Sequence, residues 1–203
     1  MKLKLLATTK AGFQLVKITQ LLPPEICDLY VEEASQVAPR PAEVLGRERR
    51  VDTEFRMADL HHPENSLFPE LQNIVTDLTG WGLKDQEQFS FLRYPEGGFV
   101  KNHNDCNVNL TRNRVGTLIV YLNDDFDGGE TFFSKLDRVF TPRKGDAIFF
   151  NYDPALRKES RKMMHGGRRV ENGEKWIVTA WMQGDGNGHI PLISEEKLQE
   201  YSA

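Results

Sequence analysis

The sequence predicts a mainly β protein with some α-helix, built as a double-stranded β-helix (jelly roll) with supporting helices on its N-terminal side. Eight short β-rich runs follow residue 87, turn residues separate them, and two helical patterns precede them. Eight runs at this spacing are typical of a double-sheet, cupin-like jelly roll. We expect one domain over residues 1–203, with a helical and irregular support at 1–85, the β core at 86–184 and a C-terminal tail at 185–203.

Composition limits the class of protein. The chain has 203 residues, of which 39% are hydrophobic, and this is enough for one domain with a real core. Its net charge of -4 does not favour nucleic acid or an anionic membrane as a partner. Cys27 and Cys106 are too few for a disulfide framework and indicate a reducing compartment. No stretch approaches the roughly 20 apolar residues of a membrane span, and no signal peptide is visible, so we expect a cytoplasmic protein.

Two helices are expected before the β-rich region. A short strand at 13–18 precedes the first helix, and Pro23-Pro24-Glu25 begins that helix because a first turn accepts proline. The apolar stripe of the first helix is Ile26, Leu29 and Tyr30. The second helix has Ser66 as its N-cap and Gly80 at its end. Its apolar residues recur at helical spacing and are Leu71, Ile74, Val75 and Leu78.

Residues 38–65 show no clear pattern. We expect a solvated loop there, and the alternative is a substrate-binding segment in which Arg49, Arg50 and Arg56 face the mouth of an active site. Three histidines lack a strand partner two residues away and are expected at the surface, namely His61, His62 and His189.

Turn residues separate the eight predicted strands. Asp127-Gly128-Gly129 can adopt positive φ at little cost, and Lys144-Gly145-Asp146 after Pro142 marks another reversal. The predicted runs are 88–94, 97–103, 115–122, 129–134, 138–142, 146–151, 163–170 and 175–183.

A candidate metal site lies at the end of the second run. Residues two apart on a strand point to the same side, so His103 and Asp105 can converge on one ion, and His165 in the seventh run is the candidate third ligand. The second and seventh strands of a jelly roll can lie side by side, so the gap in sequence is no obstacle. Two histidines and one carboxylate leave coordination positions open for a co-substrate and dioxygen, as in non-haem Fe(II) oxygenases.

The segment from Tyr94 to Gln183 resembles the 2-oxoglutarate/Fe(II)-dependent dioxygenase superfamily and, within it, the prolyl 4-hydroxylase-like branch. Four motifs in the order of that branch carry the resemblance, namely Tyr94-Pro95-Glu96-Gly97 before His103-Asn104-Asp105, Tyr121-Leu122-Asn123 before Gly128-Gly129-Glu130-Thr131, Pro142 with Gly145-Asp146-Ala147, and His165 with Gly173-x-Lys175-Trp176 and Trp181. The resemblance implies Fe(II) held by His103, Asp105 and His165 and 2-oxoglutarate as co-substrate, and it leaves room for ascorbate as a reductant.

The resemblance also implies a co-substrate pocket. Lys175 would pair with the far carboxylate of 2-oxoglutarate, since a buried ammonium needs such a partner. By strand parity Lys175 shares one face with Thr179 and Trp181. Tyr94 and Tyr121 match tyrosines that hydrogen-bond the co-substrate in the family, although both can also be ordinary core residues. The expected co-substrate-binding set is Lys175, Tyr94, Tyr121, Thr131 and Trp181.

The sequence departs from the branch pattern near the substrate side. Val100 stands where the branch has a second tyrosine, and Arg169-Val170 replaces a Pro-Val pair after the distal histidine. The basic segment 153–162 is expected to be a solvated loop or, alternatively, a lid or docking site for an acidic substrate.

The expected function is that of an enzyme, a 2-oxoglutarate- and Fe(II)-dependent dioxygenase. Its substrate is expected to be a prolyl residue in a peptide or protein, and 2-oxoglutarate would be decarboxylated to succinate and CO2. A free amino acid or another small metabolite is the alternative substrate. A nucleic-acid demethylating oxygenase is less favoured, because such enzymes usually bind the co-substrate with arginine where this chain has Lys175. A cupin-like binding module without turnover is the least favoured class, since it has no need of an intact triad.

Overall fold

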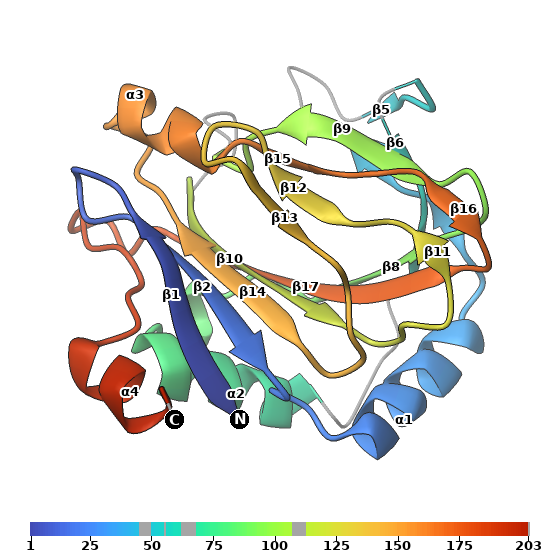
Figure 1. The fold of residues 1–203 in the computed structure, drawn as a ribbon, viewed down its shortest axis with the longest axis horizontal. Coiled ribbons are helices and arrows are strands. Elements are labelled where there is room, and N and C mark those ends of the chain that lie inside the picture. Colours follow the sequence, from blue (N-terminus) through green and yellow to red (C-terminus); the bar gives the residue numbers. More distant parts are fainter. Residues whose placement is uncertain (45–49, 55, 62–67, 107–112, 203) are drawn as a thin grey trace.

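Two antiparallel β-sheets form the centre of the fold (Figure 1). The computed structural model describes residues 1–44, 50–54, 56–61, 68–106 and 113–202. In this part of the chain the strands of the larger sheet are, in spatial order, β1 (Lys2–Thr8), β2 (Gln14–Thr19), β14 (Ala147–Asn151), β10 (Arg114–Tyr121), β17 (Lys175–Gln183), β8 (Ser90–Tyr94), β7 (Asp59–His61) and β3 (Arg40–Pro41). Those of the smaller sheet are β13 (Arg138–Phe140), β12 (Thr131–Phe133), β15 (His165–Gly167), β9 (Phe99–His103) and β6 (Arg56–Met57).

Each of the eight predicted β runs contains a strand of one of these sheets, and the second and seventh runs, β9 and β15, are neighbours. The described residues also form two small two-stranded sheets. One pairs β11 (Asp127–Gly128) with β16 (Val170–Asn172), and the other pairs β4 (Glu43–Val44) with β5 (Arg50–Val51). At the predicted turn, Gly128 and Gly129 have φ angles of +73° and +64°. Residues with a Cβ rarely adopt such angles, so the glycines allow this reversal.

One hydrophobic core lies between the two sheets, and a second lies between the larger sheet and the helices. β10 is buried along its whole length because it is covered on both faces. On β17, Ile177 belongs to the core between the sheets, whereas Trp176 and Val178 belong to the core under the helices. This alternation is the period of two that a strand imposes on its side chains.

The predicted helices α1 (Pro24–Ser35) and α2 (Phe68–Thr79) pack against the outer face of the larger sheet (Figure 1). Tyr30 of α1 meets Phe91 of β8 edge to face, with ring centroids 5.8 Å apart. The predicted stripe of α1 is wrong at Leu29, which is 43% exposed. The buried stripe is Cys27, Tyr30 and Ala34, and it follows the spacing i, i+3, i+7.

The second helix follows its prediction more closely. The fully buried residues of its predicted stripe are Leu71, Val75 and Leu78. Gly80 ends α2 with a φ of +71°, as expected of a residue just beyond a helix C-terminus. Its predicted N-cap, Ser66, lies outside the described residues.

The N-terminal segments and the tail contain more regular structure than the patterns indicated. β1 pairs with β2 at the edge of the larger sheet, and β3 to β7 lie where a loop was expected. A short 3-10 turn, η1 (Leu83–Asp85), follows α2, and α4 (Glu195–Glu200) lies in the tail. The predicted charged loop contains α3 (Arg157–Ser160) and η2 (Arg161–Met163). Short edge strands depend on pairing with their neighbours rather than on their own sequence, so pattern alone does not reveal them.

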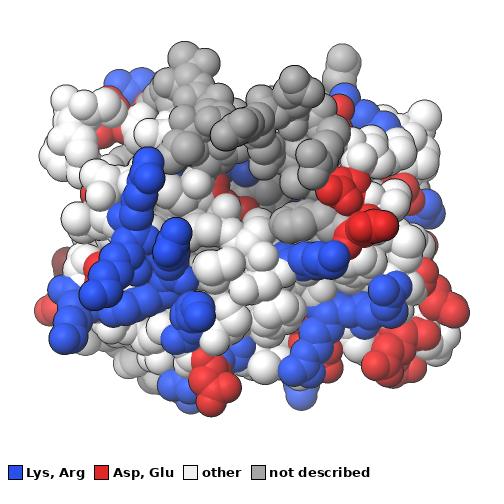
Figure 2. Space-filling view, turned by 90° about the horizontal axis from the view of Figure 1, so that it is seen from above, with Lys and Arg blue, Asp and Glu red and all other residues white. Residues whose placement is uncertain are grey.

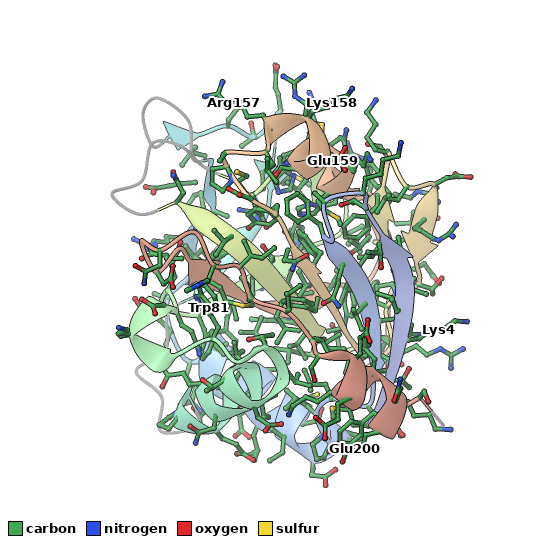
Figure 3. The ribbon with its side chains drawn as sticks, turned by 90° about the vertical axis from the view of Figure 1, so that its left-hand side faces the viewer. Lys4, Trp81, Arg157, Lys158, Glu159 and Glu200 are labelled. Atoms are coloured by element: carbon green, nitrogen blue, oxygen red, sulfur yellow. The ribbon has the colours of Figure 1, made fainter. Side chains whose placement is uncertain are left out.

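Charge is distributed unevenly over the surface. Figure 2 shows Lys and Arg side chains gathered at one side of the face seen from above, the side on which α3 lies in Figure 1. Arg157 and Lys158 of α3 point outward from the body (Figure 3).

Within the described ranges, the helices are too short or too polar for any of them to cross a membrane. Cys27 and Cys106 are both free thiols.

Candidate active site

Three side chains with metal-ligating groups meet where β9 and β15 lie side by side. His103 at the end of β9 is the register partner of His165 at the start of β15, and Asp105 follows two residues after β9. One ligand atom from each of the three lies within 4.8 Å of the others. Asp105 Oδ1 is 3.2 Å from His103 Nε2, and Asp105 Oδ2 is 3.7 Å from His165 Nε2. This donor set suits a divalent iron ion bound on one face.

Backbone carbonyls orient both imidazole rings. Nδ1 of His103 is 2.8 Å from the carbonyl oxygen of Lys101, and Nδ1 of His165 is 3.0 Å from that of Met163. A carbonyl oxygen only accepts, so each Nδ1 carries the proton and each Nε2 keeps a lone pair directed at the site. Burial, with the charge of His103 as the second cause, lowers the pKa of His165 to about 4. His165 is therefore neutral at pH 7, as a metal ligand must be.

Two donors position the carboxylate of Asp105. Thr117 Oγ1 and Trp181 Nε1 both donate to Oδ2, at 2.9 Å and 3.0 Å. Burial by itself raises the pKa of the Asp105 carboxyl, but His165 and His103, in their protonated forms, outweigh burial and hold this pKa well below its usual range. The carboxylate is ionised, and its Oδ1 is left to bind an ion.

A further layer of residues supports these donors. The guanidinium carbon of Arg114 lies 3.7 Å from the ring centroid of Trp181, and Arg114 donates two hydrogen bonds of 2.8 Å and 2.6 Å to Glu87. The hydroxyl of Tyr152 is hydrogen-bonded to that of Thr117 at 2.8 Å. Trp181, predicted to bind the co-substrate, makes its polar contact with the metal-site carboxylate, and its contact with a co-substrate stays a prediction.

A pocket with an empty volume of about 400 Å³ extends from the triad between the sheets. Every second residue of β17 from Lys175 lines this pocket, as strand parity predicts. The lining residues are Arg56, Tyr94, Val100, His103, Asp105, Ile119, Thr131, His165, Gly166, Gly167, Lys175, Ile177, Thr179 and Trp181. Metal-ligand groups and a buried cation therefore share one cavity.

Lys175 is that buried cation. It is 4% exposed, its Nζ donates to the carbonyl oxygen of Gly129 at 2.7 Å, and Nζ lies 5.4 Å from the ring centroids of Tyr94 and Tyr121. Burial lowers the pKa of Lys175 to about 7, although the charge of Glu130 acts in the opposite direction. No ion pair joins Lys175 to a carboxylate in the part of the chain that the structure describes, so an anion entering the pocket could pair with it.

The two predicted tyrosines use their hydroxyls differently. Tyr121 donates to Thr131 Oγ1 at 2.8 Å, and burial raises the pKa of Tyr121 well above its ordinary value. The Tyr94 hydroxyl accepts a hydrogen bond of 3.3 Å from Arg56 Nη2. Tyr94 and Thr131 both line the pocket, in a position to contact a ligand, and their roles toward a co-substrate stay predictions.

His61 and His189 lie away from this site. The predicted surface position of His61 is wrong, because His61 is 2% exposed, with Nδ1 3.0 Å from the carbonyl oxygen of Val37 and its ring centroid 4.9 Å from that of Trp176. It lies on β7, a strand that the pattern did not predict. His189 is exposed beside Asp185, as expected. His62 lies outside the described residues.

Thr117, which supports the site, was not identified in the sequence. Thr117 has the same strand parity as Ile119, and a lone polar residue on the inward face of an apolar strand was the signal that could have identified it. Arg56 lines the pocket, as one of the two interpretations of its segment allowed. Arg49 and the side chain of Arg50 lie outside the description. Asn104, which lies between the candidate ligands His103 and Asp105 in the sequence, donates to the carbonyl oxygen of Ser160 at 2.6 Å and so connects α3 to the candidate metal site.

The geometry agrees with the result of comparing the chain with known families. Residues 89–183 match the model of the family described as the 2OG-Fe(II) oxygenase superfamily, and this segment contains the triad and Lys175. Over this segment, which is just under half of its length, the chain is therefore similar to the 2OG-Fe(II) oxygenase superfamily. The fold is the jelly roll expected from the sequence, and Fe(II) and 2-oxoglutarate are the cofactors that the superfamily's name denotes.

Curated relatives of this chain include proteins named as prolyl 4-hydroxylases. It is 33% identical over 145 residues to Prolyl 4-hydroxylase 1 of Arabidopsis thaliana, a match that covers 61% of this chain and 51% of the relative. It is 32% identical over 111 residues to a Putative prolyl 4-hydroxylase of Acanthamoeba polyphaga mimivirus, with 48% and 45% covered. The chain thus spans about half the length of these relatives.

Solved structures give the same fold. The 2OG complex of the viral collagen prolyl hydroxylase from Paramecium Bursaria Chlorella virus-1 superposes with a TM-score of 0.66 at 25% identity, covering 84% of this chain and 96% of that one. A prolyl hydroxylase from Trichoplax adhaerens, in complex with a hypoxia inducible factor peptide fragment, superposes with a TM-score of 0.65 over 96% and 89% of the chains. At 15% identity this second likeness concerns the fold alone.

Proposed function

We propose that this protein is a 2-oxoglutarate- and Fe(II)-dependent dioxygenase that hydroxylates a prolyl residue in a peptide or protein. The observation that carries the proposal is the presence, in one pocket, of the His103, Asp105 and His165 ligand groups and the buried amine of Lys175. When bound, Fe(II) and 2-oxoglutarate supply the oxidation of a C–H bond, with dioxygen consumed and succinate and CO2 released. The protein binds and orients these groups.

The three candidate ligands fit Fe(II) in charge and orientation. Both histidines present Nε2 because their Nδ1 atoms donate to backbone carbonyls. Thr117 and Trp181 hold Oδ2 of Asp105, which fixes the direction of Oδ1. The set leaves open positions on the ion for a chelating co-substrate and for dioxygen.

The chain also fits a dicarboxylate co-substrate. Lys175 offers a positive charge inside the pocket, and Gly129 holds the amine in place through its carbonyl oxygen. Thr131, which accepts a hydrogen bond from Tyr121, adds a hydroxyl to the lining of the pocket. We propose that Lys175 binds the carboxylate of 2-oxoglutarate remote from the metal, with Tyr94, Tyr121, Thr131 and Trp181 shaping the rest of the pocket.

The names of the relatives support a prolyl substrate. Those relatives are prolyl 4-hydroxylases, and one fold neighbour is a prolyl hydroxylase in complex with a peptide fragment. Val100 stands where the branch has a tyrosine, so the substrate contact made by that hydroxyl must be supplied differently here. The two free cysteines are consistent with a reducing compartment, and we propose the cytoplasm.

The test is an anaerobic titration of the Fe(II)-loaded protein with 2-oxoglutarate, followed by admission of oxygen with proline-containing peptides. We expect a weak visible charge-transfer band, then succinate formation that the peptides stimulate and a peptide product that gains one oxygen atom. Peptides with alanine in place of proline and the His165→Ala protein are the controls. Absence of the band in iron-loaded protein would contradict an oxygenase, and a band with peptide-independent turnover would contradict a peptide substrate.

A further inference from the structure

Arg56 connects the two sheets at the pocket. It lies on β6 and is the register partner of Val100 on β9, so it belongs to the smaller sheet. Its Nη2 donates at 3.3 Å to the hydroxyl of Tyr94, which belongs to β8 of the larger sheet. Arg56 and Tyr94 both line the cavity that contains the metal-ligand groups. The guanidinium is therefore part of the wall of the pocket.

The charge of Arg56 has no counter-ion in the described part of the chain. Its Nε is buried and makes no hydrogen bond there, and its Nη2 donates to the neutral hydroxyl of Tyr94. Other partly buried arginines of this fold are paired, Arg93 with Asp59 and Arg114 with Glu87, each at 2.6 Å. A desolvated cation without an anion is costly, so a binding partner for Arg56 is expected from outside the chain.

Arg56 and Lys175 contact different parts of Tyr94. Lys175 is the register partner of Tyr94, and its amine lies 5.4 Å from the centroid of the Tyr94 ring. Arg56 contacts the hydroxyl at the other end of that residue. Tyr94 thus contacts both positively charged residues, Lys175 near its ring and Arg56 at its hydroxyl.

We propose that Arg56 is a second carboxylate-binding residue of the pocket, acting together with Tyr94. A guanidinium can donate two parallel hydrogen bonds to one carboxylate, and the unpaired Nε and the Nη atoms are its donors. The inference rests on the proposed function, in which Lys175 binds the remote carboxylate of 2-oxoglutarate. The carboxylate at Arg56 belongs either to the keto-acid end of 2-oxoglutarate or to the substrate.

The test compares binding in protein loaded with Mn(II), which replaces Fe(II) without turnover. Calorimetric titrations with 2-oxoglutarate use the wild type, Arg56→Gln and Arg56→Lys, and Arg138→Gln is the matched control because Arg138 is exposed on β13. A second series titrates the 2-oxoglutarate-loaded proteins with N-acetyl-L-proline and with its uncharged amide. Thermal unfolding verifies that each variant is folded.

We expect Arg56→Gln to weaken one of the carboxylate ligands about tenfold or more, with partial recovery in Arg56→Lys and no change in Arg138→Gln. Weaker 2-oxoglutarate binding assigns the carboxylate to the co-substrate. Unchanged 2-oxoglutarate binding with weaker binding of N-acetyl-L-proline, but not of its amide, assigns the carboxylate to the substrate.

Three results would overturn the inference, and only one of them also overturns the proposed function. If the wild type binds 2-oxoglutarate and Arg56→Gln binds every ligand equally well, Arg56 is not a carboxylate-binding residue, whereas the proposed function stands. If the wild type loaded with metal binds no 2-oxoglutarate, both are wrong. An equal loss in Arg138→Gln would show a general effect of charge and would also overturn the inference.

Discussion

Replacing Lys175 with methionine is expected to stabilise the protein while weakening its binding of 2-oxoglutarate. The amine is 4% exposed, and burial lowers its pKa from 10.5 to about 7. A difference of 3.5 pKa units, from 10.5 to about 7, corresponds to roughly 4 kcal/mol of unfavourable free energy at pH 7. Methionine has a similar length and no charge, so it removes this cost.

The gain in stability is reduced because the methionine variant loses the hydrogen bond that the amine of Lys175 makes. The carbonyl oxygen of Gly129 accepts from Lys175 at 2.7 Å and would lose this donor, which costs about 1–3 kcal/mol. The net gain in the free energy of unfolding is then about 1–3 kcal/mol, or a rise in Tm of roughly 2–10 °C for a chain of this size. Lys4→Met is the control, since Lys4 is exposed on β1 (Figure 3), and it should leave Tm almost unchanged.

The pH dependence of the gain gives an independent test. The pKa of Lys175 is lower in the folded than in the unfolded protein, so the folded protein binds fewer protons between about pH 7 and pH 10.5 and becomes more stable as the pH rises through this window. The advantage of Lys175→Met should be largest at or below pH 7 and should shrink toward pH 10.5. Urea unfolding at several pH values measures it, and calorimetry should show 2-oxoglutarate binding weakened by about tenfold to a hundredfold. A variant that is less stable than wild type, or that binds 2-oxoglutarate equally well, would refute the reasoning.

Three further predictions concern the same pocket. His165→Ala should abolish Mn(II) binding measured by electron paramagnetic resonance, whereas His189→Ala should bind Mn(II) normally. Normal Mn(II) binding by His165→Ala would exclude His165 as a metal ligand. Thr117→Val should weaken metal binding about tenfold, with recovery in Thr117→Ser, because the hydroxyl orients Asp105. In wild type, 2-oxoglutarate affinity should fall up to tenfold per pH unit above pH 7, as free Lys175 loses its proton, and a flat calorimetric profile from pH 6 to 9 would contradict this.

Local patterns in the sequence determined most of the β core. A strand repeats every two residues, so the chain alone predicted that His103 and Asp105 point to one side and that Lys175 and Trp181 share a face. Turn glycines marked where the strands end, and all eight predicted runs contain strands. The two helices were visible because each has an apolar stripe and a residue type that begins or ends a helix.

The tertiary structure decided which residues support and surround the site. The pairing that places His165 beside His103, the hydrogen bond from Thr117 to Asp105 and the position of Arg56 against Tyr94 join segments far apart in the chain. Sequence periodicity describes only the direction of a side chain from its own strand, whereas these contacts depend on which strands become neighbours and in what register. The burial of His61 has the same cause, since β7 forms a strand through its pairing with β8 and β3.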